Sequence, residues 1–224
     1  MIIRRLFAVG TVLLIVVGTY MAIVFKGNIR SFVITDDSIS NFAIAIYHID
    51  EIVNYSVDDL VNSSDTIIVA IPTGKRELRR DYIVTEVKIV KVLKTTYDLK
   101  QNSIIYVHEP VYINCVKNNE YLLLDGINNI MQTDNNYLLF LEFYQKPEGY
   151  KYNENEMRTF LFSKQFISVY SLDNSVKPLF IDDDYENSFL YKEIRDYDLV
   201  MEEKYYDTYM KLRCDVLHIF NIEH

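Results

Sequence analysis

Residues 66–71, TIIVAI, form a short, apolar, β-branched run that is followed by Pro72. β-Branched residues favour strands and proline cannot donate to a strand ladder, so the run predicts a strand that ends at Pro72. Residues 82–93 come next and are rich in Val and Ile. Their apolar positions start odd-numbered and gain even-numbered ones at Val90 and Val92. This change of face predicts a second strand that bends or carries a bulge, as small barrels require.

Further apolar segments continue the pattern to about residue 170. Residues 137–141, YLLFL, are apolar on both faces and predict a central buried strand. Asp125-Gly126 lies between two apolar runs and predicts a tight hairpin, because glycine readily adopts a positive φ. Short polar turns between so many strands predict a small antiparallel barrel, closed or nearly closed, over residues 66–180. Its other predicted strands are residues 104–107, 111–115, 121–124 and 160–169.

Helices are expected on both sides of the barrel. Residues 31–65 are predicted to be a helical connector, whose second helix begins at the capping-box-like sequence of residues 56–59. Residues 181–224 are predicted to be an acidic C-terminal helical segment, with 12 acids against 5 bases. Each segment contains apolar residues at helical spacing. These residues are Ile39, Phe42, Ile46, Ile49 and Val53 in the connector, and Met201, Tyr205, Tyr209, Leu212, Val216 and Ile219 in the C-terminal segment.

The N-terminus predicts a transmembrane anchor over residues 1–30. Residues 6–25 contain no charge and follow Arg4 and Arg5. As a helix these 20 residues would measure about 30 Å, the thickness of the hydrocarbon core of a bilayer. Two alternatives are a cleaved signal peptide, which has a shorter apolar region and a small-residue cleavage site, and a buried helix of a soluble protein, which has a polar side. We therefore expect a single-pass signal anchor that contacts the lipid bilayer.

The distribution of charge predicts where the rest of the chain lies. Residues 1–30 contain four of the 23 Lys and Arg residues and no acid, so the other 194 residues carry 19 bases against 32 acids, a net charge of −13. Asp36 and Asp37 are the first charges after the basic N-terminal region, and they favour an extracytoplasmic body. An acidic body repels nucleic acid and anionic lipid, so we expect no nucleic-acid partner.

Four segments resemble a known pattern: residues 64–70, a strand that ends at residues 92–94, residues 105–110, and residues 137–141. Together they are similar to uncharacterised, membrane-anchored extracytoplasmic proteins of Gram-positive bacteria. The resemblance implies a membrane anchor and an OB-like small β-barrel. Together with the helices predicted from the sequence on both sides of the barrel, the expected fold class is α+β, with a transmembrane helix before the barrel. It transfers no catalytic residue. The chain departs from the pattern at Thr95 and at residues 135–136, where glycines are usual.

The search for catalytic and metal-binding motifs is negative. The sequence contains no nucleophile-elbow, zinc-protease, C-x-x-C, P-loop or EF-hand motif, so no catalytic residue, metal site or cofactor is predicted. Asp182, Asp183, Asp184 and Glu186 could bind calcium or simply be solvated, and no glycine shapes the segment. Cys115 alternates with apolar neighbours and is expected to be a buried thiol.

One basic cluster stands out on the acidic body. Lys75, Arg76, Arg79 and Arg80 lie within six residues, in a segment expected to be a turn between strands. They predict a site for an anionic polymer or an acidic protein partner, although such a cluster can also be a solvated loop. The sequence therefore favours a membrane-tethered, extracytoplasmic binding domain of unknown ligand. The alternatives are an extracytoplasmic enzyme that acts on the cell envelope and a structural subunit of a membrane complex.

Overall fold

The computed structural model describes residues 11, 14–21, 32–47, 55–79, 81–116, 119–164, 166–173, 175–181 and 189–222. The chain divides into two compact units, residues 1–32 and residues 33–224. In the first unit, residues 14–21 are helical and their apolar side chains are exposed. Among the described residues, no helix has the length and apolar character needed to cross a bilayer. Most of the predicted span, residues 6–25, lies outside the described part of the chain.

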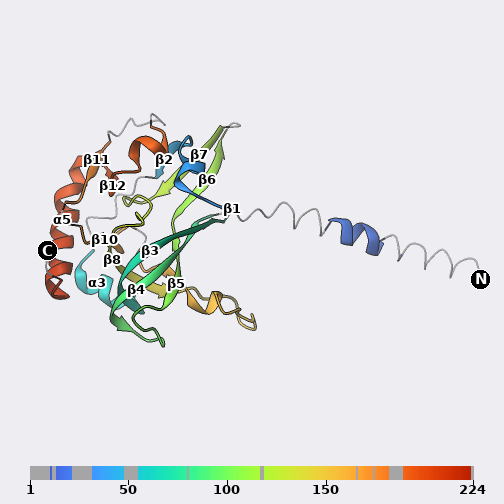
Figure 1. Ribbon diagram of the computed structural model, residues 1–224, viewed down its shortest axis with the longest axis horizontal. Helices are drawn as coiled ribbons and strands as arrows, with labels where there is room; N and C mark the ends of the chain where they lie inside the picture. Colours follow the sequence, from blue (N-terminus) through green and yellow to red (C-terminus); the bar gives the residue numbers. More distant parts are fainter. Residues whose placement is uncertain are drawn as a thin grey trace, which may run out of the picture. The chain divides into compact units, whose positions relative to one another are not determined.

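The second unit contains a closed five-stranded β-barrel (Figure 1). The strand order is β3-β4-β5-β9-β8, and β8 pairs with β3 to close the barrel. The predicted all-antiparallel barrel needs one correction, because β5 and β9 run parallel. The short strands β1 and β10 extend the sheet. The bounds are β1 Phe32–Val33, β3 Thr66–Leu78, β4 Ile83–Thr95, β5 Ile104–Glu109, β8 Tyr137–Phe143, β9 Thr159–Phe162 and β10 Val169–Ser171.

The pairing of β3 with β4 confirms the predicted bulge. Val90 and Leu93 have no partner residue in β3, so each is the extra residue of a bulge. After each bulge the alternate residues of β4 change the side of the sheet to which they point. The predicted end of the first strand at Pro72 is wrong. β3 continues to Leu78, because a register shift between Pro72 and Arg76 accommodates the proline without a ladder hydrogen bond.

A second, three-stranded sheet has the order β2-β7-β6, and a two-stranded parallel sheet pairs β11 with β12. The prediction that residues 111–115 and 121–124 belong to the barrel is therefore wrong, because they form β6 and β7 of this second sheet. The predicted hairpin at Asp125-Gly126 is wrong, because β7 pairs with β6, which precedes it, and its chain leaves the sheet after Asp125. Gly126 does have the positive φ expected, +137°.

The predicted helix through Ile46 is also wrong, because residues 43–47 form a strand parallel to β7. The bounds are β2 Ala43–Tyr47, β6 Val111–Val116, β7 Asn119–Asp125, β11 Pro178–Phe180 and β12 Leu199–Met201.

Helices cover part of the barrel. The predicted second helix of the connector is confirmed as α3, which begins with the Ser56–Asp59 capping box. The predicted C-terminal stripe is confirmed within α5, where Tyr209, Leu212 and Val216 are buried and Ile219 is exposed. It is wrong at Met201, which lies in strand β12. Figure 1 shows α5, in red, on the same side of the body as α3 and β8. The bounds are α2 Asp36–Ile39, α3 Val57–Ser63, η2 Glu156–Arg158, α4 Tyr191–Ile194, η3 Glu203–Tyr205 and α5 Tyr206–Ile219.

These helices explain why β8 is apolar on both faces. Leu138 and Phe140 point outward and pack in one core cluster with Leu212 and Val216 of α5. The alternate residues of β8, including Leu139, belong to a separate cluster that fills the barrel. The prediction of a central buried strand over residues 137–141 is therefore confirmed.

Candidate functional site

The structure separates the four basic residues of the predicted anion site. Lys75 and Arg76 lie in β3 rather than in a turn. The Lys75 side chain is 77% exposed, and its Nζ lies 3.2 Å from Oε1 of Glu86. Arg79 directly follows β3, and Arg80 lies outside the described residues.

Arg76 is buried, contrary to the expectation of a solvated loop. Its side chain is 4% exposed, and Nη1 donates to Oδ1 of Asp36 at 2.8 Å. Nη2 donates to the carbonyl oxygen of Met131. Arg76 therefore joins the segment before β2 to the barrel and cannot bind an external anion without unfolding this contact.

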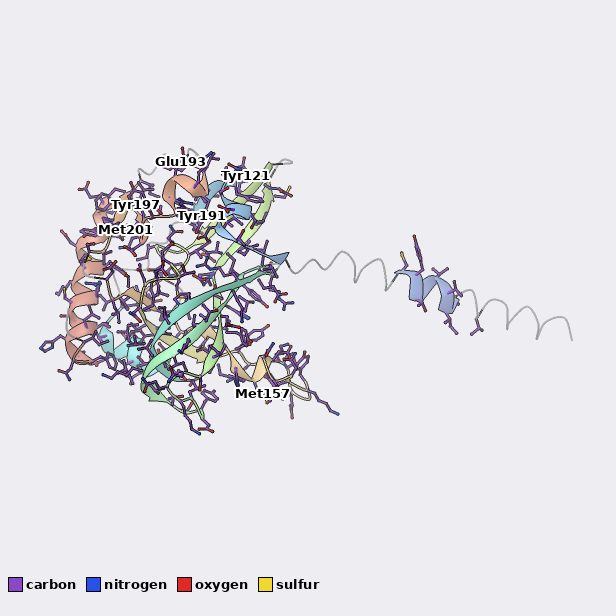
Figure 2. The ribbon with its side chains drawn as sticks, viewed as in Figure 1. Tyr121, Met157, Tyr191, Glu193, Tyr197 and Met201 are labelled. Atoms are coloured by element: carbon purple, nitrogen blue, oxygen red, sulfur yellow. The ribbon has the colours of Figure 1, made fainter. Side chains whose placement is uncertain are left out.

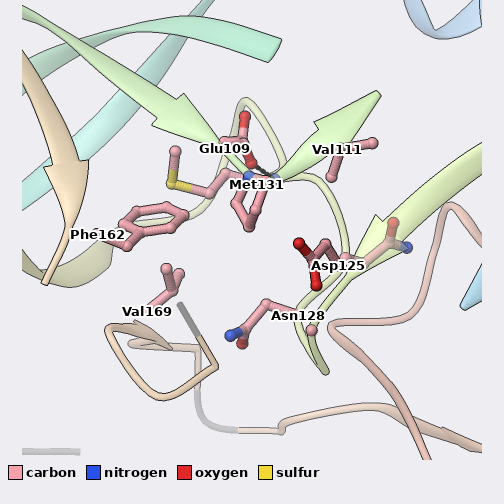
Figure 3. A pocket seen from close by; sticks show the side chains of 10 residues that line it. Glu109, Val111, Asp125, Asn128, Met131, Phe162 and Val169 are labelled. Atoms are coloured by element: carbon pink, nitrogen blue, oxygen red, sulfur yellow. Dashed lines mark hydrogen bonds between the residues drawn. The ribbon is translucent and has the colours of Figure 1, made fainter. Parts of the chain in front are cut away.

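A small interior pocket lies beside this network (Figure 3). Glu109 points toward Met131, and its carboxylate accepts hydrogen bonds from the Met131 N–H at 2.8 Å and from the Thr85 hydroxyl. Burial raises the pKa of Glu109, although the positive charge of Arg76 opposes the rise. The pocket has a volume of about 10 Å³, which is room for about one water molecule. Its size and satisfied carboxylate indicate a structural role.

A larger cleft, of about 250 Å³, lies on the outer face of β4 and β5. Side chains alternate along a strand, so Val107 of β5 points into the barrel while Tyr106 and His108 point outward. Val84 of β4 is paired with His108 and contributes an apolar part of the floor. The cleft is thus built on the barrel wall. Its lining residues are Glu77, Arg79, Tyr82, Val84, Tyr106, His108, Tyr144, Lys146, Asn153, Asn155, Glu156 and Thr159.

Aromatic rings form the centre of this floor. The ring of His108 stacks on Tyr82, with centroids 3.8 Å apart and planes at 15°. Tyr144 approaches His108 from the connection after β8, with a centroid distance of 4.8 Å. A tight turn positions the first rim, because the Arg79 N–H donates to the Tyr82 carbonyl at 2.9 Å. Arg79 therefore stands beside the ring stack, and its Nη2 donates to Glu77 at 2.7 Å.

The second rim is the connection between β8 and β9, which we call the β8–β9 arm (residues 144–158). Figure 2 shows Met157 on this arm, away from the residues labelled elsewhere on the body. Lys146 forms an ion pair with Glu156, and its Nζ lies 4.1 Å from the Tyr150 ring centroid. Asn153 and Glu156 exchange hydrogen bonds between backbone N–H and side chain, each 2.9 Å long. These contacts fix the arm and hold Lys146 at the cleft.

The electrostatic environment of His108 is unusual. Burial, together with the positive charges of Arg79 and Lys146, lowers the pKa of His108 to about 4, so the ring is neutral at pH 7. Only 7% of the residue is exposed. Its Nδ1 is buried and has no hydrogen-bond partner among the described residues. His108 thus carries an unsatisfied buried polar atom in a residue that lines the cleft.

The pKa values of Glu156 and Tyr82, which also line the cleft, are shifted away from neutral pH. Hydrogen bonds from the Asn153 backbone and from Lys146 lower the pKa of Glu156 to about 2. Burial raises the pKa of Tyr82 further above its usual value. A general acid or base works best with a pKa near the operating pH. The arrangement is thus better suited to binding than to acid–base catalysis.

The remaining candidates do not form a second site. Within the described ranges, no three His, Cys, Asp or Glu side chains gather as metal ligands would. The possible calcium segment, Asp182–Asp184 with Glu186, lies outside those ranges. Cys115 and Cys214 are both free and exposed, so the expected buried thiol at Cys115 is wrong. Cys115 shares the strand face of Val111 and Ile113, but it lies near the end of β6 and is exposed there.

Sequence reasoning identified Arg79 but missed the rest of the cleft. The available signal was the alternation of apolar Ile105 and Val107 with Tyr106 and His108, which marks a strand with a polar outer face. Lys146 gave no local signal, because only the folded barrel places it near His108.

Comparisons with protein-family models, with curated proteins and with solved structures returned no match to this chain.

Proposed function

We propose that the chain is a membrane-tethered, extracytoplasmic binding domain with an OB-like barrel, and that its ligand binds in the cleft over β4 and β5. The observation that carries this proposal is the position of the cleft. OB-fold barrels bind ligands across their second and third strands, between the loop after the first strand and the loop after the fourth. In this barrel the corresponding elements are β4, β5, the turn after β3 and the β8–β9 arm.

The strand order supports the same interpretation. Numbered along the chain, the barrel strands follow the order one, two, three, five, four, with one parallel pair between the third and the fifth. That arrangement is the one found in OB-like barrels. The helices α3 and α5 cover the opposite part of the wall, where Leu138 and Phe140 are buried, so the cleft face is left for a ligand.

The enzyme and structural-subunit alternatives fit the cleft less well. The pKa of His108 lies far below neutrality, and Glu156 is held ionised by Lys146, so neither group is suited to proton transfer. A surface used only for subunit contact needs no concave, polar-lined pocket. A ligand-binding role uses both the aromatic floor and the charged rims.

A panel of ligands tests the binding proposal. We would measure the melting temperature of the full-length protein in detergent with glycans, peptides and nucleotides, and compare it with the variants Tyr82→Ala and Tyr197→Ala. Tyr197 lies outside the cleft lining and serves as a matched aromatic control. A ligand should raise the melting temperature of the wild type and the control but not that of Tyr82→Ala. Ligands that stabilise all three proteins equally would place binding elsewhere.

The tether is tested in cells. Protease added to intact protoplasts should digest residues 33–224 if the uncharged span of residues 6–25 anchors an extracytoplasmic body. A cytoplasmic marker protein must stay intact in the same sample. Protection of the body, or its release into the medium as a shorter chain, would contradict this part of the proposal.

A further inference from the structure

We infer that the ligand of the cleft is an acidic glycan, a sugar chain that carries carboxylate or phosphate groups. Arg79 and Lys146 would bind its negative groups from opposite rims, and the rings of Tyr82 and Tyr144, which pack on His108, would contact its sugar faces. This inference rests on the proposed function and adds the chemical class of the ligand.

The first step is the position of the two cations. Arg79 comes from the turn after β3 and Lys146 from the β8–β9 arm, and both line the same cleft. Each has a carboxylate partner, Glu77 or Glu156, but a guanidinium has five N–H donors and an ammonium has three. Each cation therefore keeps donor capacity for a ligand, and its carboxylate partner holds it in place for binding.

The second step is the electrostatic potential at the floor. Arg79 and Lys146 both lower the pKa of His108 and both oppose the rise in the pKa of Tyr82. The lining also contains their carboxylate partners, Glu77 and Glu156. The two cations nevertheless act on the rings of the floor from both rims, on a body whose net charge is −13. A negative ligand group is favoured at this place, although the body as a whole repels anions.

The third step is the buried nitrogen of His108. A neutral imidazole has one N–H donor and one acceptor, and Nδ1 has no partner within the described part of the chain. His108 lines the cleft, but Nδ1 itself is covered by protein and only 7% of the residue is exposed. A sugar hydroxyl that reaches Nδ1 when the covering side chains move can donate to this nitrogen or accept from it, so it satisfies either tautomer.

The remaining lining favours a sugar over other anions. Tyr82, Tyr106 and Tyr144 present an apolar ring with a polar hydroxyl, and the amides of Asn153 and Asn155 both donate and accept. The chain has no Trp, the residue most often used to stack on sugars, so tyrosine rings supply the flat faces. Nucleic acid is less favoured, because its binding requires many phosphate contacts and this cleft contains two cations.

The test measures affinity with the full-length protein in detergent. The probes are an oligogalacturonide, which carries carboxylates, a phosphorylated oligomannoside, a neutral maltohexaose, inorganic polyphosphate and oligo(dT). We expect the two acidic glycans to bind more tightly than the other three probes. Their affinity should fall as salt is increased, since the rims are exposed to solvent. The stronger of the two acidic glycans identifies whether the negative group is a carboxylate or a phosphate.

Matched variants locate the binding. Arg79→Gln and Lys146→Gln should each weaken acidic-glycan binding about tenfold, the scale of one charge-assisted hydrogen bond. Lys75→Gln removes the same charge from β3 outside the cleft and should leave affinity unchanged. Because Lys146 also contacts Glu156, Lys146→Arg serves as a second variant that keeps the charge and should restore binding.

Four results would overturn the inference. They are no binding of either acidic glycan, equal binding of maltohexaose, tighter binding of polyphosphate or oligo(dT), and equal loss in Lys75→Gln and Arg79→Gln. Maltohexaose binding that depends on Tyr82 would leave the proposed function standing while rejecting the acidic ligand. Failure of every probe in the broad melting-temperature panel would instead count against the proposed function itself.

Discussion

His108 and Glu109 are adjacent on β5, yet their side chains lie on opposite sides of the barrel wall. His108 stacks on Tyr82 on the outer face, where the tilted ring of Tyr144 also approaches it, whereas Glu109 points inward to Met131 and Thr85. The two-residue repeat of a strand imposes this separation. One short segment therefore supplies both the floor of the cleft and a buried polar contact of the barrel end.

Acid should destabilise the protein through His108. Its folded pKa is about 4, below the ordinary value of 6.5, so between these values only the unfolded chain binds the proton. Stability is present above pH 6.5 and is lost as pH falls through 4, by about 3 kcal/mol for this group. His108→Phe keeps a ring in the stack and removes the titration. Between pH 7 and pH 4.5 the melting temperature of the wild type should fall further than that of this variant. Parallel plots of melting temperature against pH would show that His108 titrates normally.

Glu109 should have the opposite pH dependence. Its pKa is raised above 4.5 in the folded state, so the folded chain retains a proton that the unfolded chain releases as pH rises. This contribution to stability is present at low pH and is lost as pH rises above 4.5. Glu109→Gln cannot titrate, and its melting temperature should decline less than that of the wild type between pH 4.5 and pH 7. A variant curve that declines more steeply than the wild type would mean that Arg76 lowers the pKa instead.

Substitutions of Arg76 and of Arg79 should have very different effects on the free energy of unfolding. Arg76→Met leaves Asp36 and the buried Glu109 without their cation and should reduce the free energy of unfolding by about 3 kcal/mol. Arg79→Ser removes an ion pair whose arginine side chain is 45% exposed. The free energy of unfolding should therefore change by no more than about 0.5 kcal/mol. Denaturant titration measures both values. Equal losses in the two variants would show that the basic segment acts as one structural unit.

Gly126 should be sensitive to any β-branched substitution. Its φ of +137° lies where side chains with a Cβ atom are strained, so Gly126→Val should cost about 1–3 kcal/mol. The strain arises where the chain leaves β7, even though no hairpin forms there. Thermal unfolding of the variant beside the wild type measures the loss. An unchanged melting temperature would mean that the backbone can adopt another conformation at this position.

Local patterns in the sequence predicted the elements whose contacts are also local or repetitive. The β-branched run at residues 66–71, the change of face at Val90, the capping box at Ser56 and the apolar stripe of α5 each reflect the geometry of a single strand or helix. Residues 39–46 misled the prediction, because their apolar spacing fits a helix while pairing with β7 makes residues 43–47 a strand. The partner lies 78 positions away along the chain, at Tyr121 for Ala43, and no local pattern records it.

The sequence by itself determined where β3, β4, β5 and β8 form, the acidic body with its basic cluster, and the positive φ at Gly126. It did not determine that residues 111–115 and 121–124 leave the barrel and form a second sheet with β2, because that choice depends on pairing with a distant strand. Only the tertiary structure decided which cations serve a site. It buried Arg76 against Asp36 and brought Lys146 to the ring of His108, because closure of the barrel places the β8–β9 arm beside β5. Burial and proximity then set the charge state of each group, and both depend on residues far apart in the chain.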